Sequence, residues 1–378
     1  MMSEPTIYLA LTDDWELRGD GSGDIRKLQF YPLRKLLSIY GNYDVQSTFN
    51  AEVMQQLTFR HFQTKHPELK PLADAWDDAV CEAFQKGHDI QLHIHPQWSK
   101  ATYQNGRWHL SGDWALPRYD QSAAHSMLAQ SKNYLENLLR RLDPTYKCVA
   151  FRSGSSCIAP SPFALSVLAQ LGIVFDMSIV GGLRVNTRNL QMDYSQCEES
   201  FLPFYPCMDD ARKVSKKPEP IVCLPIFHFY LSRRQSFKQV LSKSMQKVGR
   251  KLSSDGLTNK DSEDYARQWV EVDRSTRFKR AYDKAIKPCL KRKYMVADLS
   301  QLNYAGLKEM LTATRVRTRQ LGFRELPVIL TCHSKYIEDF RAIESFVRDV
   351  SKAPDIKFAT LSDIARKLQA GDFAIKTK

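Results

Sequence analysis

The stretch Ile7–Glu16, IYLALTDDWE, is apolar from Ile7 to Leu11 and then carries two adjacent carboxylates, Asp13 and Asp14. An apolar run of this length is typical of a buried strand. Neighbouring residues of a strand point to opposite faces, so both carboxylates can serve one site only where the strand has ended and the backbone turns. The alternative is that a buried strand ends in polar residues that face water.

A second apolar stretch, residues 87–98 (GHDIQLHIHPQW), ends in His93 and His95, which are followed by Pro96. Residues two apart in a strand share one face, so both imidazoles can reach one point in space. Two histidines with one carboxylate are a common catalytic zinc set that leaves a position for water. Taken alone, the HIH triplet is equally compatible with a polar strand end beside a proline.

Strand-like runs alternate with helical patterns along most of the chain. Residues 72–87 and 161–172, for example, have apolar residues at helical spacing and close on a glycine. This alternation predicts parallel strands in an α/β fold, and eight strand-like runs favour a distorted or incomplete barrel over an open sheet. The runs cover residues 7–12, 45–50, 89–95, 148–152, 173–179, 220–227, 326–333 and 356–361.

Polar side chains gather where these runs end. Barrels of this kind carry their chemistry at the carboxyl ends of the strands. The polar residues at or near the strand ends are Asp13, Asp14, His93, His95, Arg152, Asp176 and His333. We therefore expect a single site at this end of the barrel, although Asp176 is also suited to a hydrogen bond in the core.

Two segments interrupt the pattern in what we take to be a single catalytic domain, residues 1–378. Residues 99–120 contain two short alternating runs around Asn105-Gly106, which predicts a hairpin loop. Residues 231–300 contain helical patterns and are strongly basic, and strand-like runs resume after them. We interpret this second segment as a mainly helical insertion.

Charge is concentrated in that insertion. The chain has a net charge of +13, and residues 233–293 hold 18 Lys and Arg against 7 Asp and Glu, so most of the excess lies there. The eight cysteines form no C-x-x-C pair, the N-terminus has no signal-like pattern, and no apolar run is long enough to span a membrane. These features predict a cytoplasmic protein.

The motifs together resemble the polysaccharide deacetylase family, carbohydrate esterases with a distorted (β/α)7 barrel. Residues 12–15 (TDDW) are similar to the family's first motif, T-F-D-D-G, and GHDIQLH resembles the lead-in G-H-E-I-G-N-H. The second histidine comes two residues after the first and resembles an H-x-H-P variant. FRSGSS (residues 151–156) resembles the arginine motif, and ILTCHS (residues 329–334) resembles the closing histidine motif.

The resemblance implies a role for each matched residue. Asp14, His93 and His95 would bind a divalent metal, most simply Zn²⁺. Asp13 would be the general base, Arg152 its partner and His333 the acid that protonates the leaving amine. Substrate contacts would come from Trp15, Trp98, Ser153 and Asp176, with the two tryptophans stacking on a sugar ring, although loop aromatics also commonly pack the barrel mouth.

The expected activity is the metal-dependent removal of an N-acetyl or similar small acyl group from a sugar in glycan or surface-polysaccharide biosynthesis. The substrate's carrier, whether nucleotide, lipid or polymer, stays open. One alternative is a catalytically silent carbohydrate-binding relative, which would be expected to lack an acid or histidine. Another is a nucleic-acid-binding protein that uses the basic segment, but that segment has few aromatic residues and no nucleic-acid motif. The basic segment fits peripheral contact with an anionic membrane, or a solvated helical face.

Overall fold

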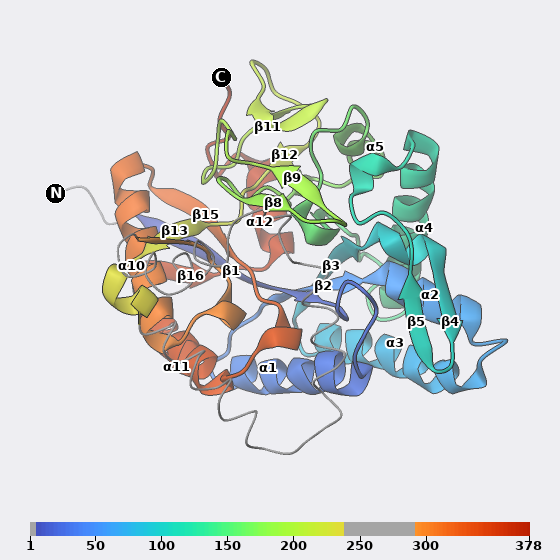
Figure 1. Cartoon of the computed structure of the whole chain (residues 1–378). Helices are drawn as coiled ribbons and strands as arrows, with labels where there is room; N and C mark the ends of the chain where they lie inside the picture. The colour runs from blue at the N-terminus through green and yellow to red at the C-terminus, as the bar shows by residue number, and fades with distance from the viewer. Residues whose placement is uncertain (1–4, 238–291) are drawn as a thin grey trace, which may run out of the picture.

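The computed structural model describes residues 5–237 and 292–378, and its centre is one curled parallel sheet. The strands lie in the order β12-β7-β6-β3-β2-β1-β15, with β16 pairing to β1. A bridge between Ile226 and Ile329 brings the two ends of the sheet together. The sheet is therefore an incomplete barrel surrounded by helices, as Figure 1 shows, and the expected α/β class is confirmed.

The strands of this sheet differ widely in length. Their bounds are β1 (Thr6–Trp15), β2 (Thr48–Glu52), β3 (Asp89–Ile94), β6 (Ala150–Ser153), β7 (Phe175–Asp176), β12 (Val222–Cys223), β15 (Glu325–Leu330) and β16 (Ile356–Phe358).

Strand β1 sends alternate side chains to two different cores. Tyr8 and Ala10 belong to the core inside the barrel, whereas Trp15 belongs to the core between the sheet and the outer helices. The strand continues to Trp15, three residues beyond its predicted end. Because the backbone does not turn at the acidic pair, Asp14 continues the inner face and Asp13 continues the outer face.

Most helices cover the outside of the barrel, and neighbours along the chain pack against one another (Figure 1). They are α1 (Tyr31–Gly41), α2 (Val53–Phe62), α3 (Lys70–Gln85), α4 (Gln121–Leu139), α5 (Ala164–Gln170), α10 (Tyr304–Leu321) and α11 (Phe340–Val350). Short helical turns lie at Arg26–Phe30, Pro67–Leu69, Pro96–Lys100, Leu116–Arg118, Gly154–Ser156, Leu299–Gln301 and Ser334–Tyr336.

Helix α12 (Leu361–Ala370) closes one end of the barrel. Its first backbone amides donate to Thr48 and Asp89, which begin β2 and β3, and its apolar face joins the inner core. Since this helix fills the end where the strands begin, the interior can open only at their carboxyl ends.

The remaining strands form two-stranded sheets. The predicted hairpin is confirmed as β4 (Ala101–Gln104) paired with β5 (Arg107–Leu110), and Asn105 and Gly106 both have positive φ in its turn. The other pairs are β8 (Arg184–Asn186) with β9 (Gln191–Asp193), β10 (Pro206–Cys207) with β11 (Asp210–Val214), and β13 (His228–Leu231) with β14 (Lys293–Val296).

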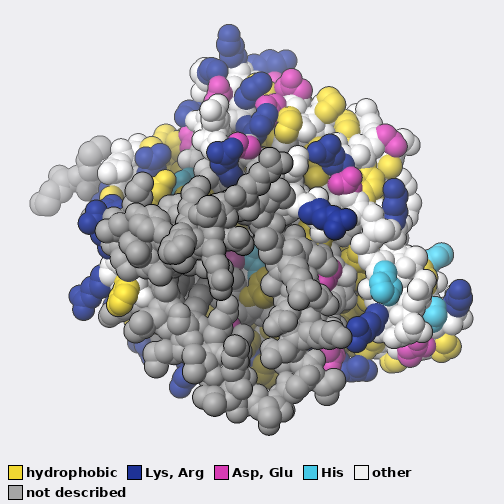
Figure 2. Space-filling view, viewed as in Figure 1, with side chains coloured by type: hydrophobic (Ala, Val, Ile, Leu, Met, Phe, Trp, Pro, Cys, Tyr) yellow, Lys and Arg dark blue, Asp and Glu magenta, His cyan; other side chains and the backbone are white. Residues whose placement is uncertain are grey.

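The predicted basic insertion, residues 231–300, falls mostly on residues 238–291, which lie outside the described residues. The antiparallel pair β13 and β14 flanks this segment, so the described chain leaves and returns at one place. On the described part of the face in Figure 2, Lys and Arg side chains are spread around the margin. None of the described helices is both long enough and apolar enough to cross a membrane.

Candidate metal and catalytic site

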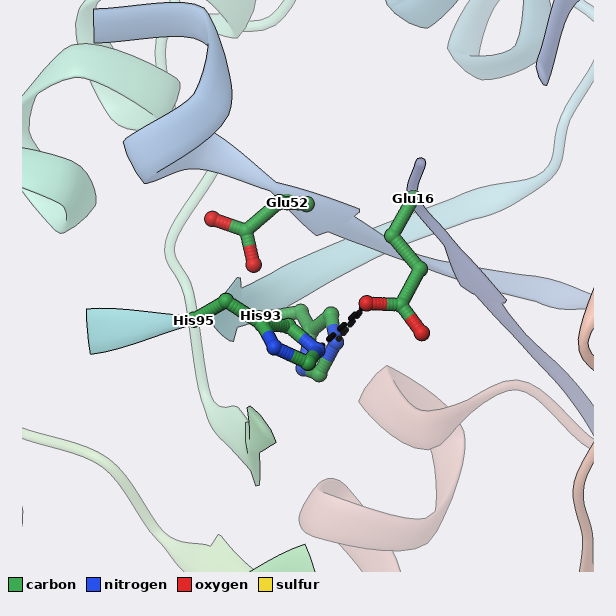
Figure 3. Close-up of side chains that lie close together, drawn as sticks. All are labelled: Glu16, Glu52, His93 and His95. Carbon is green, nitrogen blue, oxygen red and sulfur yellow. Dashed lines mark hydrogen bonds and ion pairs between the residues drawn. The ribbon is translucent and has the colours of Figure 1, made fainter. Parts of the chain in front are cut away.

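His93 of β3 and His95, which directly follows β3, converge on Glu16, which follows β1 (Figure 3). The Nε2 atom of His93 lies 3.4 Å from Glu16 Oε2, and Nε2 of His95 contacts the same oxygen. On the other side of the His93 ring, Nδ1 donates to the backbone carbonyl of Arg152 at 2.8 Å. That hydrogen bond fixes the ring so that Nε2 faces the carboxylate, the usual arrangement of a metal-binding histidine.

Glu52 completes a buried cluster of four groups. Ligand atoms of Glu16, Glu52, His93 and His95 lie within 4.8 Å of one another. The Oε2 atom of Glu52 is buried without a hydrogen-bond partner, and burial, its largest influence, raises the pKa of Glu52 to about 8. Two imidazoles and two carboxylates are a donor set that suits Zn²⁺ and similar divalent metals. This buried group could therefore bind a metal.

Asp14 lies outside that cluster and has other partners. Its Oδ1 accepts from Asn50 at 2.9 Å, and its Oδ2 accepts from Arg152 Nε at 3.1 Å. Although burial alone would raise the pKa of Asp14, the neighbouring Arg152, His93 and His333 lower it to about 2. Asp14 is therefore a carboxylate at neutral pH.

His333 faces Asp14 from the segment that follows β15. Its Nε2 lies 3.4 Å from Asp14 Oδ2, and its Nδ1 lies 2.8 Å from Asp298 Oδ2. Burial alone would lower the pKa of His333, but the Asp298 and Asp14 carboxylates outweigh burial and raise it. An imidazolium held between two carboxylates can donate a proton near neutral pH.

Asp13 is on the other side of the strand. Its Oδ1 accepts from the backbone amide of Ser334 at 2.7 Å, and burial raises its pKa to about 7. Arg152, expected to pair with Asp13, pairs with Asp14 instead, because only Asp14 shares the inner face of the sheet with it. This corrects the predicted partnership.

A cavity of about 670 Å³ opens over these groups. Asp14, Glu16, His95, Arg152 and His333 line it, and Asp13 does not. The rest of the lining includes the apolar and aromatic side chains Val180, Leu183, Val185, Tyr294, Met295, Val296 and Tyr336. A cavity of this size suits a small-molecule substrate.

The four predicted substrate-binding residues do not line this cavity. Trp15 is buried against Trp76, and its indole nitrogen donates to the backbone of Gln29, while Trp98 packs against aromatic rings beneath the hairpin. Both tryptophans are core residues and cannot stack on a sugar in this structure.

Ser153 and Asp176 are buried polar residues that form hydrogen bonds within the protein. Ser153 Oγ donates to the carbonyl of Cys157 at 2.8 Å, and Ser178 donates to both oxygens of Asp176. The backbone amide of Ser153 also donates to Ser178 Oγ at 2.8 Å, and this bond ties together the loops that follow β6 and β7. The neighbouring Ser155 and Ser156 line the cavity in place of Ser153.

Four residues of the site were missed from the sequence: Glu16, Glu52, Asp298 and Lys335. A signal existed for Glu16, because Asp14 and Glu16 are two apart on one strand, the same spacing that identified His93 and His95. The side chain of Lys335 is buried, and its Nζ donates to Glu16 Oε1 at 2.6 Å. Nothing in the local sequence marks Asp298, which meets His333 only through the fold.

No family model matches the sequence, and a search of curated proteins finds no match. Polysaccharide deacetylases are among the solved structures with a similar backbone arrangement. A putative polysaccharide deacetylase from Mycobacterium smegmatis has 15% identity and a TM-score of 0.49, covering 100% of this chain and 95% of its own. The allantoinase PuuE has 11% identity and a TM-score of 0.48, with 97% and 91% coverage.

A probable polysaccharide deacetylase from Pseudomonas aeruginosa has 12% identity and a TM-score of 0.46, with 97% and 92% coverage. At such low identities and TM-scores, these similarities carry no conclusion about the reaction of this chain. The chemistry has to be inferred from the site itself.

Proposed function

We propose that this protein is a metal-dependent hydrolase that removes an acetyl or similarly small acyl group from an N-acylated sugar. The main support is one observation: the buried cluster of Glu16, His93 and His95 lies at the same cavity as a carboxylate, Asp14, and a histidine, His333. Metal ligands, a proton acceptor and a proton donor around one cavity are the parts that amide hydrolysis requires.

Glu16, His93 and His95 would hold the metal, and the unpaired oxygen of Glu52 is close enough to serve as a further ligand. Two histidines and a carboxylate favour Zn²⁺. When bound, such a metal lowers the pKa of water and polarises the acyl carbonyl.

Asp14 and His333 divide the proton transfers between them. Asp14, kept ionised and held by Arg152, accepts a proton from the attacking water as oxygen adds to the acyl carbon. His333, whose charged form Asp298 favours, donates a proton to the nitrogen as the C–N bond breaks. The products are the free amine and a carboxylate such as acetate.

This assignment shifts the roles predicted from the sequence along β1. Asp14 replaces Asp13 as the base, and Glu16 replaces Asp14 as the metal ligand. The inner face of the strand supports the shift, since Asp14 and Glu16 line the cavity and Asp13 packs behind it.

We propose a sugar as the substrate because of the size and the lining of the cavity. Its polar side carries Asp14, Arg152 and Lys335, which can bind hydroxyl groups, and Tyr294 and Tyr336 offer aromatic rings. We propose that the reaction belongs to glycan or surface-polysaccharide biosynthesis in the cytoplasm. Lipid-linked and nucleotide-linked sugars are the first substrates to test.

Metal analysis and an acetate-release assay on N-acetyl sugars test the proposal together. We expect one divalent metal per wild-type chain, loss of that metal in Glu16→Gln, and retention in Asp14→Asn. Turnover of Asp14→Asn and His333→Ala should fall roughly 10²- to 10⁴-fold.

Asp13→Asn is the matched control for Asp14→Asn, because it makes the same change on the opposite face of the strand. If Asp13→Asn loses turnover while Asp14→Asn keeps it, the shifted assignment is wrong. If the metal-loaded protein releases no acetate from nucleotide-linked, lipid-linked or polymeric N-acetyl sugars, the deacetylase proposal is wrong.

A further inference from the structure

A second cavity of about 670 Å³ lies beside the candidate catalytic site. The chain that follows β1 separates the two cavities: Glu16 and Gly19 line the first, and Arg18 and Gly21 line the second. Residues two apart in sequence are separated by at most about 7 Å. The two cavities therefore lie on either side of one short segment, and a substrate that extends past this segment would reach both.

Residues of hairpin β4–β5 also line the second cavity. Tyr103 and Trp108 face each other across the hairpin with ring centroids 4.6 Å apart, and Phe59 stacks on Trp108. Gly21 has φ of +79°, and a Cβ there would lie only 2.9 Å from Cβ of Trp108. Glycine thus allows the loop to approach the hairpin closely and fixes the shape of the cavity.

The lining has an excess of positive charge. Arg18, Arg26, Lys27 and Arg107 contribute four cationic groups, against the carboxylates of Asp20 and Asp24. Asp24 accepts from the backbone amide of Arg26, and Asp20 accepts from that of Ser22. The two acids are therefore partly engaged by their own loop.

The four cationic side chains have no ion pair or side-chain hydrogen bond with any residue that the structure describes. Of the four, Arg18 is partly buried, and Arg26, Lys27 and Arg107 are exposed. Unlike Arg18, the partly buried Arg60 and Arg315 have carboxylate partners: Arg60 pairs with two aspartates, and Arg315 forms two hydrogen bonds with Asp355. Cationic groups that converge without partners repel one another, and a bound anion removes that repulsion. Arginine in particular pairs with phosphate through two parallel hydrogen bonds.

We propose that this second cavity binds a diphosphate group through Arg18 and Arg107, so that the sugar to be deacylated carries such a group. The inference rests on the proposed function for the identity of the sugar, but the anion site itself does not depend on turnover. A diphosphate fits better than a single carboxylate because cationic groups from both the loop and the hairpin face the same space.

Calorimetric titration of the full chain with inorganic pyrophosphate tests the site. We expect saturable binding with one site per chain, weakened by salt. Arg18→Gln and Arg107→Gln should each weaken binding roughly tenfold, the loss that follows from removing one charge-assisted hydrogen bond. Circular dichroism of both variants checks that they are folded.

Arg341→Gln is the matched control, since it removes one positive charge from a side chain that is 92% exposed and outside this cavity. Equal weakening in Arg341→Gln would show a general charge effect and overturn the proposal, as would the absence of saturable binding. A nucleoside diphosphate that binds more tightly than pyrophosphate would indicate a nucleotide carrier whose base contacts Trp108. Equal affinity would point to a lipid diphosphate.

Failure of this site is distinguishable from failure of the proposed function. Pyrophosphate binding needs no hydrolysis, so it can fail while acetate release succeeds. Binding can also succeed in a protein that releases no acetate, which would leave the anion site in place and remove only the deacetylase proposal.

Discussion

At the scale of single residues, the candidate metal site depends on how Glu16 is held. Lys335 Nζ donates to Glu16 Oε1 at 2.6 Å and to the carbonyl of Leu17 at 3.0 Å, while Oε2 faces the two histidines. The lysine therefore occupies one oxygen and leaves the other for the metal. Groups that orient metal ligands in this way typically matter by about 10- to 100-fold in metal affinity.

We predict that Lys335→Met weakens metal binding by about 10- to 100-fold, because Glu16 loses the group that orients it. Competition with a chelating dye measures this affinity directly, without an activity assay. Lys352→Met, at an exposed position, should leave the affinity unchanged. An unchanged affinity in Lys335→Met would show that Glu16 is positioned without the lysine.

The same residues show what the sequence could predict about the site. His93, His95 and His333 were selected because each ends a strand-like run, and the structure places all three at the candidate site. The pattern did not reveal that β1 continues to Trp15, and the proposed function therefore moves the roles of the acidic pair along the strand. Neighbouring residues of a strand point to opposite faces, so a small change in the strand end decides whether Asp13 or Asp14 faces the cavity.

At the scale of elements, the turn after β6 packs directly against the end of β3. A Cβ on Gly154 would lie 2.7 Å from the carbonyl oxygen of Ile94 and 2.9 Å from Cγ of His95. We predict that Gly154→Ala displaces His95, costs about 1 to 3 kcal/mol of unfolding free energy and weakens metal binding.

Urea unfolding and chelator competition measure both effects of Gly154→Ala. Gly41→Ala is the matched control, because Gly41 ends helix α1 and no atom lies within 4 Å of its added Cβ. That control should be neutral or slightly stabilising. Wild-type metal affinity in Gly154→Ala would show that the turn can move away from His95.

The start of β3 carries a histidine with a structural role. His88 Nδ1 accepts from the backbone amide of Ser47 at 3.2 Å, and its ring lies against Tyr40 and Phe49. Burial lowers the pKa of His88 to about 4 from an ordinary value of 6.5. The folded state therefore favours the neutral ring.

Because the pKa of His88 is lower in the folded state, the neutral ring stabilises the fold fully above pH 6.5. This stabilisation is lost as the pH falls toward 4. The loss should reach roughly 3 kcal/mol. We predict that His88→Gln, whose amide oxygen can still accept from Ser47, unfolds with a smaller dependence on pH between 6.5 and 4. Urea unfolding across this range measures it, with exposed His125→Gln as the control. An equal pH dependence in wild type and His88→Gln would contradict the assignment.

At the scale of the whole molecule, the alternation of strands and helices was enough to predict the parallel, incomplete barrel, because parallel strands need long crossovers. The contacts that complete the site were harder to predict. Asp298 follows β14 and reaches His333, and Lys335 reaches Glu16 from the turn that follows β15, the strand next to β1. Such pairings join residues far apart in sequence, and periodicity carries no information about them.

The uneven distribution of charge also belongs to this scale. Residues 233–293 carry an excess of 11 positive charges, while the rest of the chain is nearly balanced. We predict that this segment brings the enzyme to the anionic face of a membrane. Each Lys or Arg near an anionic leaflet contributes about 1 kcal/mol, and physiological salt limits that attraction to about 8 Å.

Vesicle sedimentation tests this prediction. The protein should bind vesicles that contain anionic lipid and not neutral ones, and added salt should release it. Neutralising Lys291, Arg292 and Lys293 together with Arg277, Lys279 and Arg280 should weaken the binding, because several simultaneous contacts are needed for residence at the surface. Removing the same number of charges elsewhere on the chain is the control. Equal binding to both kinds of vesicle that does not depend on salt would contradict the prediction. It would favour the alternative that the segment only covers the barrel. Neither result affects the catalytic assignment.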